Sequence, residues 1–487
     1  MRIPGPTRSL TWLSAWLYLA AWGATLIDQY LHLPASGNLA GLAMLLFLVL
    51  QFPQQRRYVQ VLFLALLVIG LGGVAVAADP AALFLAGWRR GAVYGSFFLA
   101  LSTLRDAAET SPLVRRCGRH LVAQSPGRRY AALTGGGHLF GIILSYGAVE
   151  LLAAMVVRAN TLGAADGSDA ARTVRRRRML MAIYRGFCVM NCWNPLNLMT
   201  AVVSTAVPGA PMRLLMPIAF VVSIGMAALG WLEDRLFARR INRSGPADRL
   251  ATNESWSIHL RIVGLVGFVL VVSELCGLVF RVPLVASVTL TVPVVALGWA
   301  VVQAWRFIRT EGRLPSLFRM IGVLHRRAAR FRLRVPEFRG EATVLASAGF
   351  MGVAVGGVLS GAGLTPLIGL LPSPIIPLLV PVLLIATGQI GLNPVAVVAL
   401  LGAAVPDPAA FGVPPAVLGF ACMLGWGLAV AMTPMSASAI ITARWAGVSP
   451  WTVSSNWNSV FAASALLLAW GAILLLFAFF PAPFTVD

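Results

Sequence analysis

The sequence contains no lysine and few acids, since all 38 basic residues are arginine against 17 aspartates and glutamates. Charged residues make up 11% of the 487 positions, whereas a soluble domain carries about 25%. No glycine-rich phosphate loop ending in lysine is present, so ATP hydrolysis is not expected. The scattered acids form no cluster of the kind that a membrane-embedded enzyme needs. The five cysteines, an odd number lying mostly in apolar segments, predict no disulfide framework.

Long apolar stretches dominate what is present. Hydrophobic residues make up 58% of the chain, and the mean hydropathy is +0.82. The composition therefore predicts a polytopic all-α membrane protein whose partner is the lipid bilayer. The net charge of +21 lies in loops between apolar runs, so it indicates topology and predicts no nucleic-acid binding.

We expect about eleven transmembrane helices and two re-entrant helical hairpins in a bacterial cytoplasmic (inner) membrane. Arg56 and Arg57 follow the second span and place the N-terminus in the cytoplasm, because short cytoplasmic loops are arginine-rich. The same count leaves the C-terminus outside. The expected spans lie near residues 10–26, 39–52, 59–78, 91–104, 179–207, 214–232, 262–280, 284–302, 342–364, 416–445 and 460–480.

Basic segments separate these spans. Residues 105–129 and 306–339 interleave arginines with apolar side chains, a pattern typical of helices lying on the cytoplasmic leaflet. With the loop at 235–249 they suggest four parts: N-terminal scaffold helices at 1–104, a first repeat at 105–257, scaffold helices and a basic segment at 258–341, and a second, inverted repeat at 342–487.

Two pairs of short apolar runs predict the hairpins. The first pair, 130–144 and 148–157, is separated by Ser145, Tyr146 and Gly147 and has arginines at both outer ends. A hairpin opening to the cytoplasm fits this charge pattern; the alternative is one continuous span. The second pair, 374–386 and 395–405, meets around Gly388, Gln389 and Asn393 and has no flanking arginine, so it should open outward.

Two apolar segments are interrupted by proline and polar residues. In the first, Pro195 lies among Asn191, Asn194 and Asn197; in the second, Pro434 follows Thr433. Proline removes a backbone donor and breaks the helix, and lipid cannot satisfy the freed groups. Aligning Pro195 with Pro434 also pairs Asn194 with Thr433, Leu196 with Met435, and Asn197 with Ser436.

Interrupted segments in matching positions of two halves indicate a transporter's binding site. The N-terminus of a half-helix suits an anion, and freed carbonyls suit a cation such as sodium, the one candidate cofactor. The alternative is a simple proline kink inside a bundle. The expected solute site comprises Ser145, Tyr146, Gly147, Asn191, Asn194, Pro195, Asn197, Thr200, Gln389, Asn393, Thr433, Pro434, Ser436 and Ser438. The expected coupling-ion site comprises Glu150, Ser145, Asn194, Gly388, Asn393 and Thr433.

Three ionisable residues near these segments have open roles. Glu150, in an apolar run past the first tip, can hold a cation or proton, or pair with an arginine. Arg185 can neutralise an anion, and we expect it rather to extend to the cytoplasmic interface. His138, after three glycines, is expected to be a packed polar residue, and no Cys or His cluster completes a metal site around Cys188 and Cys192.

The order of hairpin, broken helix, spans, inverted hairpin and broken helix resembles the ion transporter superfamily, which includes divalent anion/sodium symporters and arsenite permeases. The resemblance extends from about Tyr130 to the end. It rests on Asn194-Pro195-Leu196-Asn197, Thr433-Pro434-Met435-Ser436 and the tip residue Ser145, whereas Tyr146 and Gly147 depart from the family's usual tip. The resemblance implies a homodimer in which a transport domain, made of the hairpins and broken helices, slides against a fixed scaffold.

These observations predict a secondary active transporter and not an enzyme. It would move a small anionic solute by an elevator-like mechanism, coupled to sodium or protons. A cation/proton antiporter is the nearest alternative, and a membrane-embedded enzyme or a passive channel is a further one. The sequence specifies neither the solute nor the direction of transport.

Overall fold

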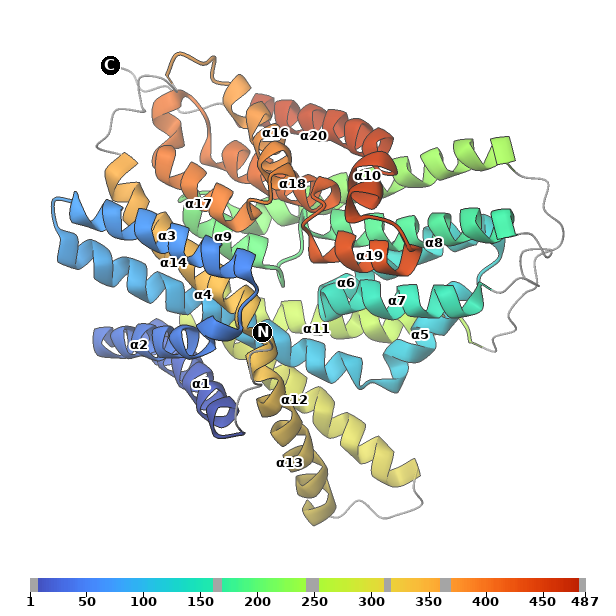
Figure 1. Cartoon of the computed structure of the whole chain (residues 1–487), viewed down its shortest axis with the longest axis horizontal. Coiled ribbons are helices and arrows are strands. Elements are labelled where there is room, and N and C mark those ends of the chain that lie inside the picture. Colours follow the sequence, from blue (N-terminus) through green and yellow to red (C-terminus); the bar gives the residue numbers. More distant parts are fainter. Residues whose placement is uncertain (1–7, 161–168, 242–253, 311–316, 360–368, 481–487) are drawn as a thin grey trace. The chain divides into compact units, whose positions relative to one another are not determined.

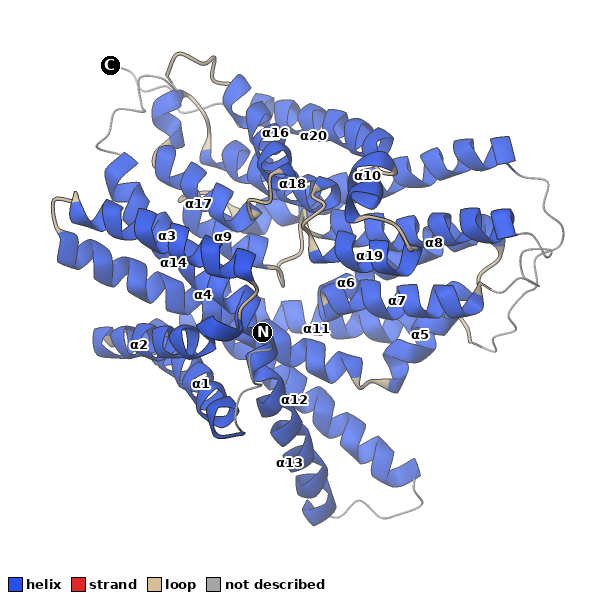
Figure 2. Cartoon of the chain, in the orientation of Figure 1, coloured by secondary structure: helices blue, strands red, loops and turns tan. Residues whose placement is uncertain are grey.

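The computed structural model describes residues 8–160, 169–241, 254–310, 317–359 and 369–480, and in these ranges the regular structure is entirely helical (Figures 1 and 2). This agrees with the predicted all-α class. The helices in order are α1 Arg8–Leu31, α2 Pro34–Gln51, α3 Arg57–Ala75, α4 Pro80–Glu109, α5 Pro112–Val122, α6 Pro126–Leu144, α7 Tyr146–Ala159, α8 Asp169–Met190, α9 Leu198–Ala206, α10 Met212–Ile241, α11 Ser257–Phe280, α12 Leu284–Thr310, α13 Leu317–Arg334, α14 Arg339–Leu359, α16 Ile375–Gln389, α17 Pro394–Ala404, α18 Pro415–Met432, α19 Ala437–Ala446 and α20 Ser459–Phe479.

Eight stretches in the described part are long and apolar enough to cross a membrane, so the chain is an integral membrane protein. The expected spans at 91–104, 179–207 and 342–364 are not among the eight, and the total of eleven stays a prediction. Residues 242–249 of the expected basic loop, 360–364 of the ninth expected span and the chain ends before residue 8 and after residue 480 lie outside the described residues. The eight stretches are Leu10–Leu31, Pro34–Gln54, Arg57–Ala75, Met212–Leu236, Ser257–Phe280, Leu284–Arg309, Pro415–Ala446 and Ser459–Phe479.

The chain divides into two compact units. The first comprises Met1–Ser111, Gly267–Leu364 and Ala399–Pro406, and the second comprises Pro112–Val266, Thr365–Val398 and Asp407–Asp487. Both hairpin tips and both helix breaks belong to the second unit. The candidate site can therefore be described within one unit.

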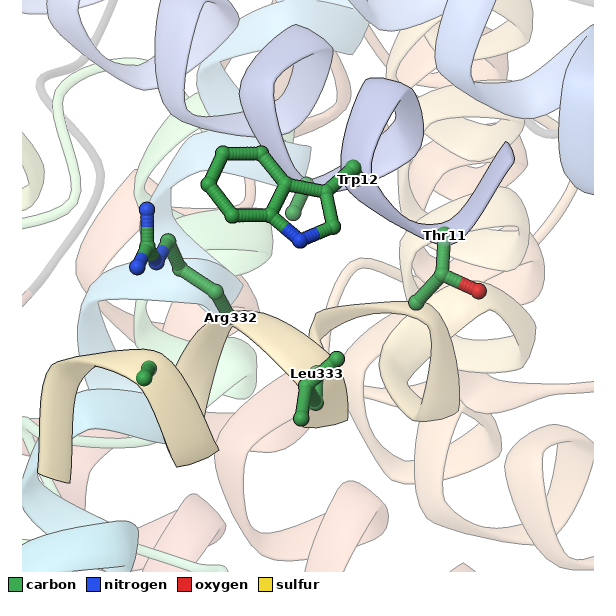
Figure 3. A pocket seen from close by; sticks show the side chains of 6 residues that line it. Thr11, Trp12, Arg332 and Leu333 are labelled. Carbon is green, nitrogen blue, oxygen red and sulfur yellow. The ribbon is translucent and has the colours of Figure 1, made fainter. Parts of the chain in front are cut away.

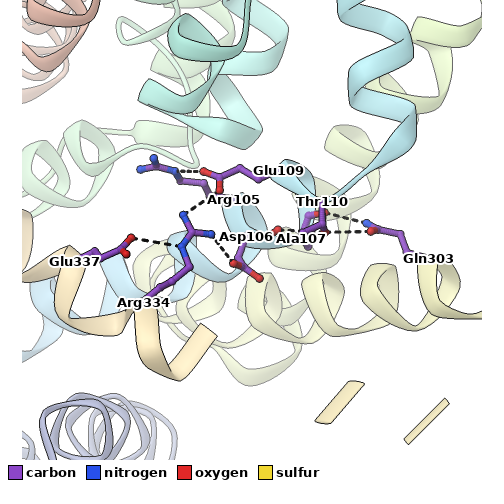
Figure 4. Close-up of polar contacts among 8 residues, drawn as sticks. All are labelled: Arg105, Asp106, Ala107, Glu109, Thr110, Gln303, Arg334 and Glu337. Atoms are coloured by element: carbon purple, nitrogen blue, oxygen red, sulfur yellow. Dashed lines mark hydrogen bonds and ion pairs between the residues drawn. The ribbon is translucent and has the colours of Figure 1, made fainter. Parts of the chain in front are cut away.

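In the first unit, α4 packs along α14 and α12. Small residues allow this approach, because a Cβ on Gly91 of α4 would lie 2.7 Å from the backbone oxygen of Ala346 on α14. An ion-pair network lies at the end of α4, where Arg334 contacts Asp106 at 2.8 Å and Glu109 at 2.9 Å (Figure 4). This network ties the basic helix α13 to α4.

Two of the expected segments near α4 have different boundaries in the structure. The expected fourth span at 91–104 is too short, because α4 runs from Pro80 to Glu109. The expected surface helix at 105–129 is three pieces: the end of α4, the amphipathic helix α5, and the start of α6 at Pro126. Pro112 and Pro126 each begin a helix, where the missing N–H of proline costs nothing.

In the second unit, α6 and α7 fold back on each other. A Cβ on Gly136, nine positions before Ser145, would lie 3.5 Å from the side chain of Leu152, seven positions after it. The predicted hairpin shape is therefore observed, and the continuous-span alternative is wrong. Its re-entrance from the cytoplasm stays a prediction. The tip is shorter than expected, because Ser145 alone links the helices and Tyr146 already begins α7.

The second pair of short helices is arranged differently. Helix α16 continues to Gln389, so Gly388 and Gln389 belong to the helix and not to the link before α17. Helix α16 packs along α18, while α17 belongs to the first unit from Ala399 onward. The first pair lies whole within one unit and the second pair is divided.

Candidate functional site

Both predicted helix breaks are present. Helix α8 ends at Met190 and α9 begins at Leu198, while α18 ends at Met432 and α19 begins at Ala437. At the end of α8 the Met190 carbonyl is satisfied within the break, because it accepts the amides of Trp193 and Asn194. The polar residues of each break hold the chain in this interrupted form.

The first break is held by asparagine side chains. The Oδ1 of Asn194 accepts the Leu196 amide at 2.9 Å, and Thr200 donates its hydroxyl to the Asn194 carbonyl at 2.9 Å. The Oδ1 of Asn197 caps α9 by accepting the Met199 amide at 3.4 Å. The Asn197 amide also bonds to Asn191, whose own amide donates to the Phe187 carbonyl. Asn191, Asn194 and Thr200 are buried.

The second break repeats this pattern at the positions aligned through proline. The Thr433 hydroxyl oxygen accepts the Met435 amide at 3.3 Å, as Asn194 does for Leu196. The Ser436 hydroxyl oxygen caps α19 by accepting the Ala439 amide at 3.1 Å, as Asn197 does for α9. The sequence alignment of the two segments therefore corresponds to the same backbone chemistry at both.

Helices α8 and α18 pack against each other next to their breaks. A Cβ on Gly427 would lie 2.2 Å from the sulfur of Cys192, and the Tyr184 hydroxyl donates to the Ala431 carbonyl at 2.9 Å. Helix α8 also contacts α19, and α9 contacts α18. The two interrupted segments thus lie together in the second unit.

The end of α16, next to the second tip, is hydrogen-bonded to the second break. The Thr433 hydroxyl donates to the Gly388 carbonyl, and the Gln389 amide donates to the Met432 carbonyl at 2.8 Å. Across the described residues, the shielded Oε1 of Gln389 has no hydrogen-bond partner, and neither has the buried hydroxyl of Thr442 on α19. Two acceptors therefore remain open around the second break, where an unpaired buried group is costly.

The first tip contacts α8 through rings and methyl groups. The Tyr146 ring lies 5.5 Å from the Phe187 ring, and a Cβ on Gly141 would lie 2.8 Å from the Met190 side chain. Ser145 has a φ of 50°, a conformation that costs a residue with a side chain about 1–3 kcal/mol. Gly147 lies in the first turn of α7.

Two predicted site residues lie elsewhere. Glu150 forms an ion pair with Arg444 of α19, and its side chain is 42% exposed. That geometry favours the structural alternative that we gave for Glu150. Asn393 accepts the Val395 amide at 2.9 Å and so begins α17, four residues beyond the bonded Gln389. Pro195 and Pro434 lie within the breaks as expected, whereas Ser438 is buried in the first turn of α19.

The prediction that Arg185 extends to the membrane interface is wrong. Its side chain is buried, donates to Asn458 at 2.9 Å and to the Tyr130 hydroxyl at 3.2 Å, and pairs with Glu233 at 3.1 Å. Its guanidinium also lies 4.8 Å from the centre of the Phe461 ring. Arg185 therefore joins α6, α8, α10 and α20 into one body. A buried arginine is stable only with such partners.

Trp193 was not among the predicted site residues. It lies in the first break, and its Nε1–H donates to His138 Nε2 of α6 at 2.9 Å, which makes that ring nitrogen the acceptor. The Phe220 ring packs against Trp193 at 4.6 Å. This contact anchors the break to the hairpin. The sequence signal was present, because a tryptophan inside an asparagine-rich break needs a polar partner for its N–H.

No group of His, Cys, Asp or Glu able to hold a metal ion occurs within the described ranges. A small cavity of about 230 Å³ lies in the first unit between α1 and α13, where the Arg332 guanidinium lies over the Trp12 ring (Figure 3). It contains none of the predicted site residues.

Neither a protein-family model nor a curated protein matches the chain. A solved structure does: "Crystal structure of the Alcanivorax borkumensis YdaH transporter reveals an unusual topology". The two share 16% sequence identity, with a TM-score of 0.55, over 87% of this chain and 99% of that one. At this identity the similarity establishes a common fold.

Proposed function

We propose that this protein is a secondary active transporter that moves a small anionic solute across the bacterial cytoplasmic membrane, coupled to sodium or protons. The observation that carries the proposal is the pair of helix breaks with matched hydrogen bonding, which lie together in one unit. Interrupted helices at membrane depth are tolerated where they are buried in protein or line a water-filled cavity, and in transporters such a cavity holds the solute.

The chemistry of the breaks supports an anionic solute. Helices α9 and α19 both begin at a break, and each directs the positive end of its dipole toward it. In α9 the Met199 and Thr200 amides bond to the Asn197 side chain and carbonyl, and in α19 the Ala439 amide bonds to the Ser436 hydroxyl. The first-turn amides outside these bonds would be donors for a carboxylate or an oxyanion. The nearby arginine, Arg185, is fully engaged with protein partners, so the backbone would supply the anion contacts.

The second break offers oxygen atoms for a coupling cation. The open Oε1 of Gln389 lies on the residue next to Gly388, whose carbonyl already contacts Thr433. Amide and hydroxyl oxygens of this kind suit sodium. A cation/proton antiporter would instead need a titrating acid, and the pairing of Glu150 with Arg444 gives that alternative no support.

The division of the chain supports elevator-like movement. Both tips and both breaks belong to the second unit, whereas α1–α4 and α12–α14 belong to the first. An elevator needs such a division into a solute-carrying body and a scaffold. We propose that the second unit is the transport domain, and that the first unit is the scaffold of a homodimer.

The test is solute flux in proteoliposomes under imposed sodium or proton gradients. Succinate and arsenite are the first probes, because the resembled family includes carriers of both kinds, and a thermal-shift screen of anions extends the panel. We expect Thr433→Val and Asn194→Ala each to lower flux at least tenfold, and Ser223→Ala to leave it unchanged. Ser223 is also buried but donates to a carbonyl of its own helix. Wild-type flux in both site variants would refute the proposed site.

A further inference from the structure

A groove of about 530 Å³ lies on the second unit between α5, α6, α10 and the start of α11, and no residue of the helix breaks lines it. Its floor is one face of α6, formed by Ala131, Ala132, Gly135, Gly136 and Leu139. A Cβ on Gly135 would meet nothing within 4 Å, so the floor is open along this helix. The floor is apolar and suits a hydrocarbon chain better than a hydrated solute.

Arginine and tryptophan form one end of this groove. Arg128 and Gly127 come from the first turn of α6, and Arg235 and Trp231 come from α10. The Arg235 guanidinium lies 4.6 Å from the centre of the Trp231 ring and donates to the Gly127 carbonyl at 3.3 Å. Trp256, next to the start of α11, also lines the groove. Tryptophans and arginines together are typical of the level where lipid headgroups meet the hydrocarbon.

Neither arginine has an acidic partner among the described residues of the neighbouring helices. The acids on the elements around the groove already have other partners: Glu233 pairs with Arg185, Asp234 with Arg178, and Glu254 with Arg116. Arg128 and Arg235 are both exposed. An anionic group is the complement that this end of the groove lacks.

We propose that this groove binds an anionic phospholipid. The phosphate lies between Arg128 and Arg235, beside the N-terminal end of α6, and an acyl chain follows the floor past Gly135. Basic pockets between membrane helices bind headgroups such as that of cardiolipin in this way. The bound lipid bridges α6 of the hairpin to α10, so the lipid composition of the membrane would influence the unit that holds the breaks.

Lipid binding can be measured by native mass spectrometry of the detergent-purified full chain, titrated with cardiolipin, phosphatidylglycerol or phosphatidylethanolamine. We expect both anionic lipids to be retained more tightly than phosphatidylethanolamine. Arg128→Ala with Arg235→Ala should weaken their binding roughly fivefold per arginine, and roughly twenty-five-fold together. The control pair Arg115→Ala with Arg158→Ala removes the same charge from exposed positions outside the groove and should leave binding unchanged.

A second variant keeps both arginines and blocks the floor. Gly135→Leu should weaken the binding of long-chain phosphatidylglycerol more than that of its dihexanoyl analogue, and it keeps the test valid if the double arginine variant does not fold. Equal retention of phosphatidylethanolamine, or unchanged binding in Gly135→Leu and in the arginine pair, would overturn the proposal. Competition by glycerol phosphate as effective as that by the whole lipid would also overturn it, because it would indicate a site for a soluble anion.

Discussion

The contact between α6 and α8, the closest between helices in the described part of the second unit, predicts the effect of Gly186→Ala. A Cβ at this position of α8 would lie 2.0 Å from the backbone oxygen of Thr134 on α6, whereas ordinary contacts begin at 3.4 Å. The helices would have to separate by about 1.4 Å, and no side chain can rotate away because the obstacle is backbone. Gly137 on α6 meets the Ile183 carbonyl of α8 in the same way, at 2.3 Å, so the two backbones are in contact on both sides.

Overpacking of this kind costs about 1–3 kcal/mol. On the scale of about 2–4 °C per kcal/mol for a domain of moderate size, we expect the apparent Tm to fall by roughly 2–12 °C. All five cysteines are buried, so a thiol-reactive fluorescent dye reports unfolding of the detergent-purified protein directly.

Two further glycines calibrate the measurement. Gly425 of α18 stands as far before Pro434 as Gly186 stands before Pro195, and its Cβ would meet the Pro381 Cα at 2.9 Å and a movable Leu384 methyl at 2.8 Å. Gly425→Ala should therefore lower the Tm by less than Gly186→Ala. Gly471→Ala, with nothing within 4 Å, should leave the Tm unchanged or slightly higher. A Tm for Gly186→Ala at or above that of wild type would show that α6 and α8 are not in backbone contact.

Two other perturbations test the supports of the site. Arg185→Met should lower stability by about 3–5 kcal/mol, because it leaves Glu233 without its charge partner inside the bundle. The double variant Arg185→Met with Glu233→Gln should recover part of this loss in the same thermal assay. Asn197→Ala and Ser436→Ala should each lower stability by about 1 kcal/mol, because each removes a helix cap. The exchanges Asn197→Ser and Ser436→Asn keep a capping oxygen and should be nearly neutral. Equal losses of stability in all four variants would contradict the capping roles.

The helix breaks could be predicted from the sequence because their cause is local. Proline cannot donate the bond that a continuing helix needs, and the residues around Pro195 and Pro434 are those that bond to nearby backbone. Local chemistry also specifies the two helix caps, because the alignment of the two prolines pairs Asn197 with Ser436, and these residues cap α9 and α19. The first hairpin could be predicted from the arginines at its outer ends and the short length of its two apolar segments.

Tertiary contacts decided what the sequence left open. Arg185 has partners on segments 48 to 276 residues away, and no local pattern indicates them. Glu150 lies 294 residues from Arg444, and only the fold shows the pair to be at a partly exposed position. The second tip was placed too early in the chain, because α16 continues through Gly388 to Gln389 despite the helix-weakening effect of glycine.

The two halves share their backbone chemistry at the breaks but differ in how each tip is held. At the second tip, the hydrogen bonds from Thr433 and Gln389 would have to be broken before the tip could leave the break, at a net cost of about 1 kcal/mol each. At the first tip, Ser145 stores conformational strain of similar size, which movement of the tip could release. If the tips act as the gates of the proposed transporter, the second gate is therefore the costlier to open in this conformation. The solute that opens it must accept the hydrogen bonds that Thr433 and Gln389 now donate, as an anion can, while the open Oε1 of Gln389 can contact a cation.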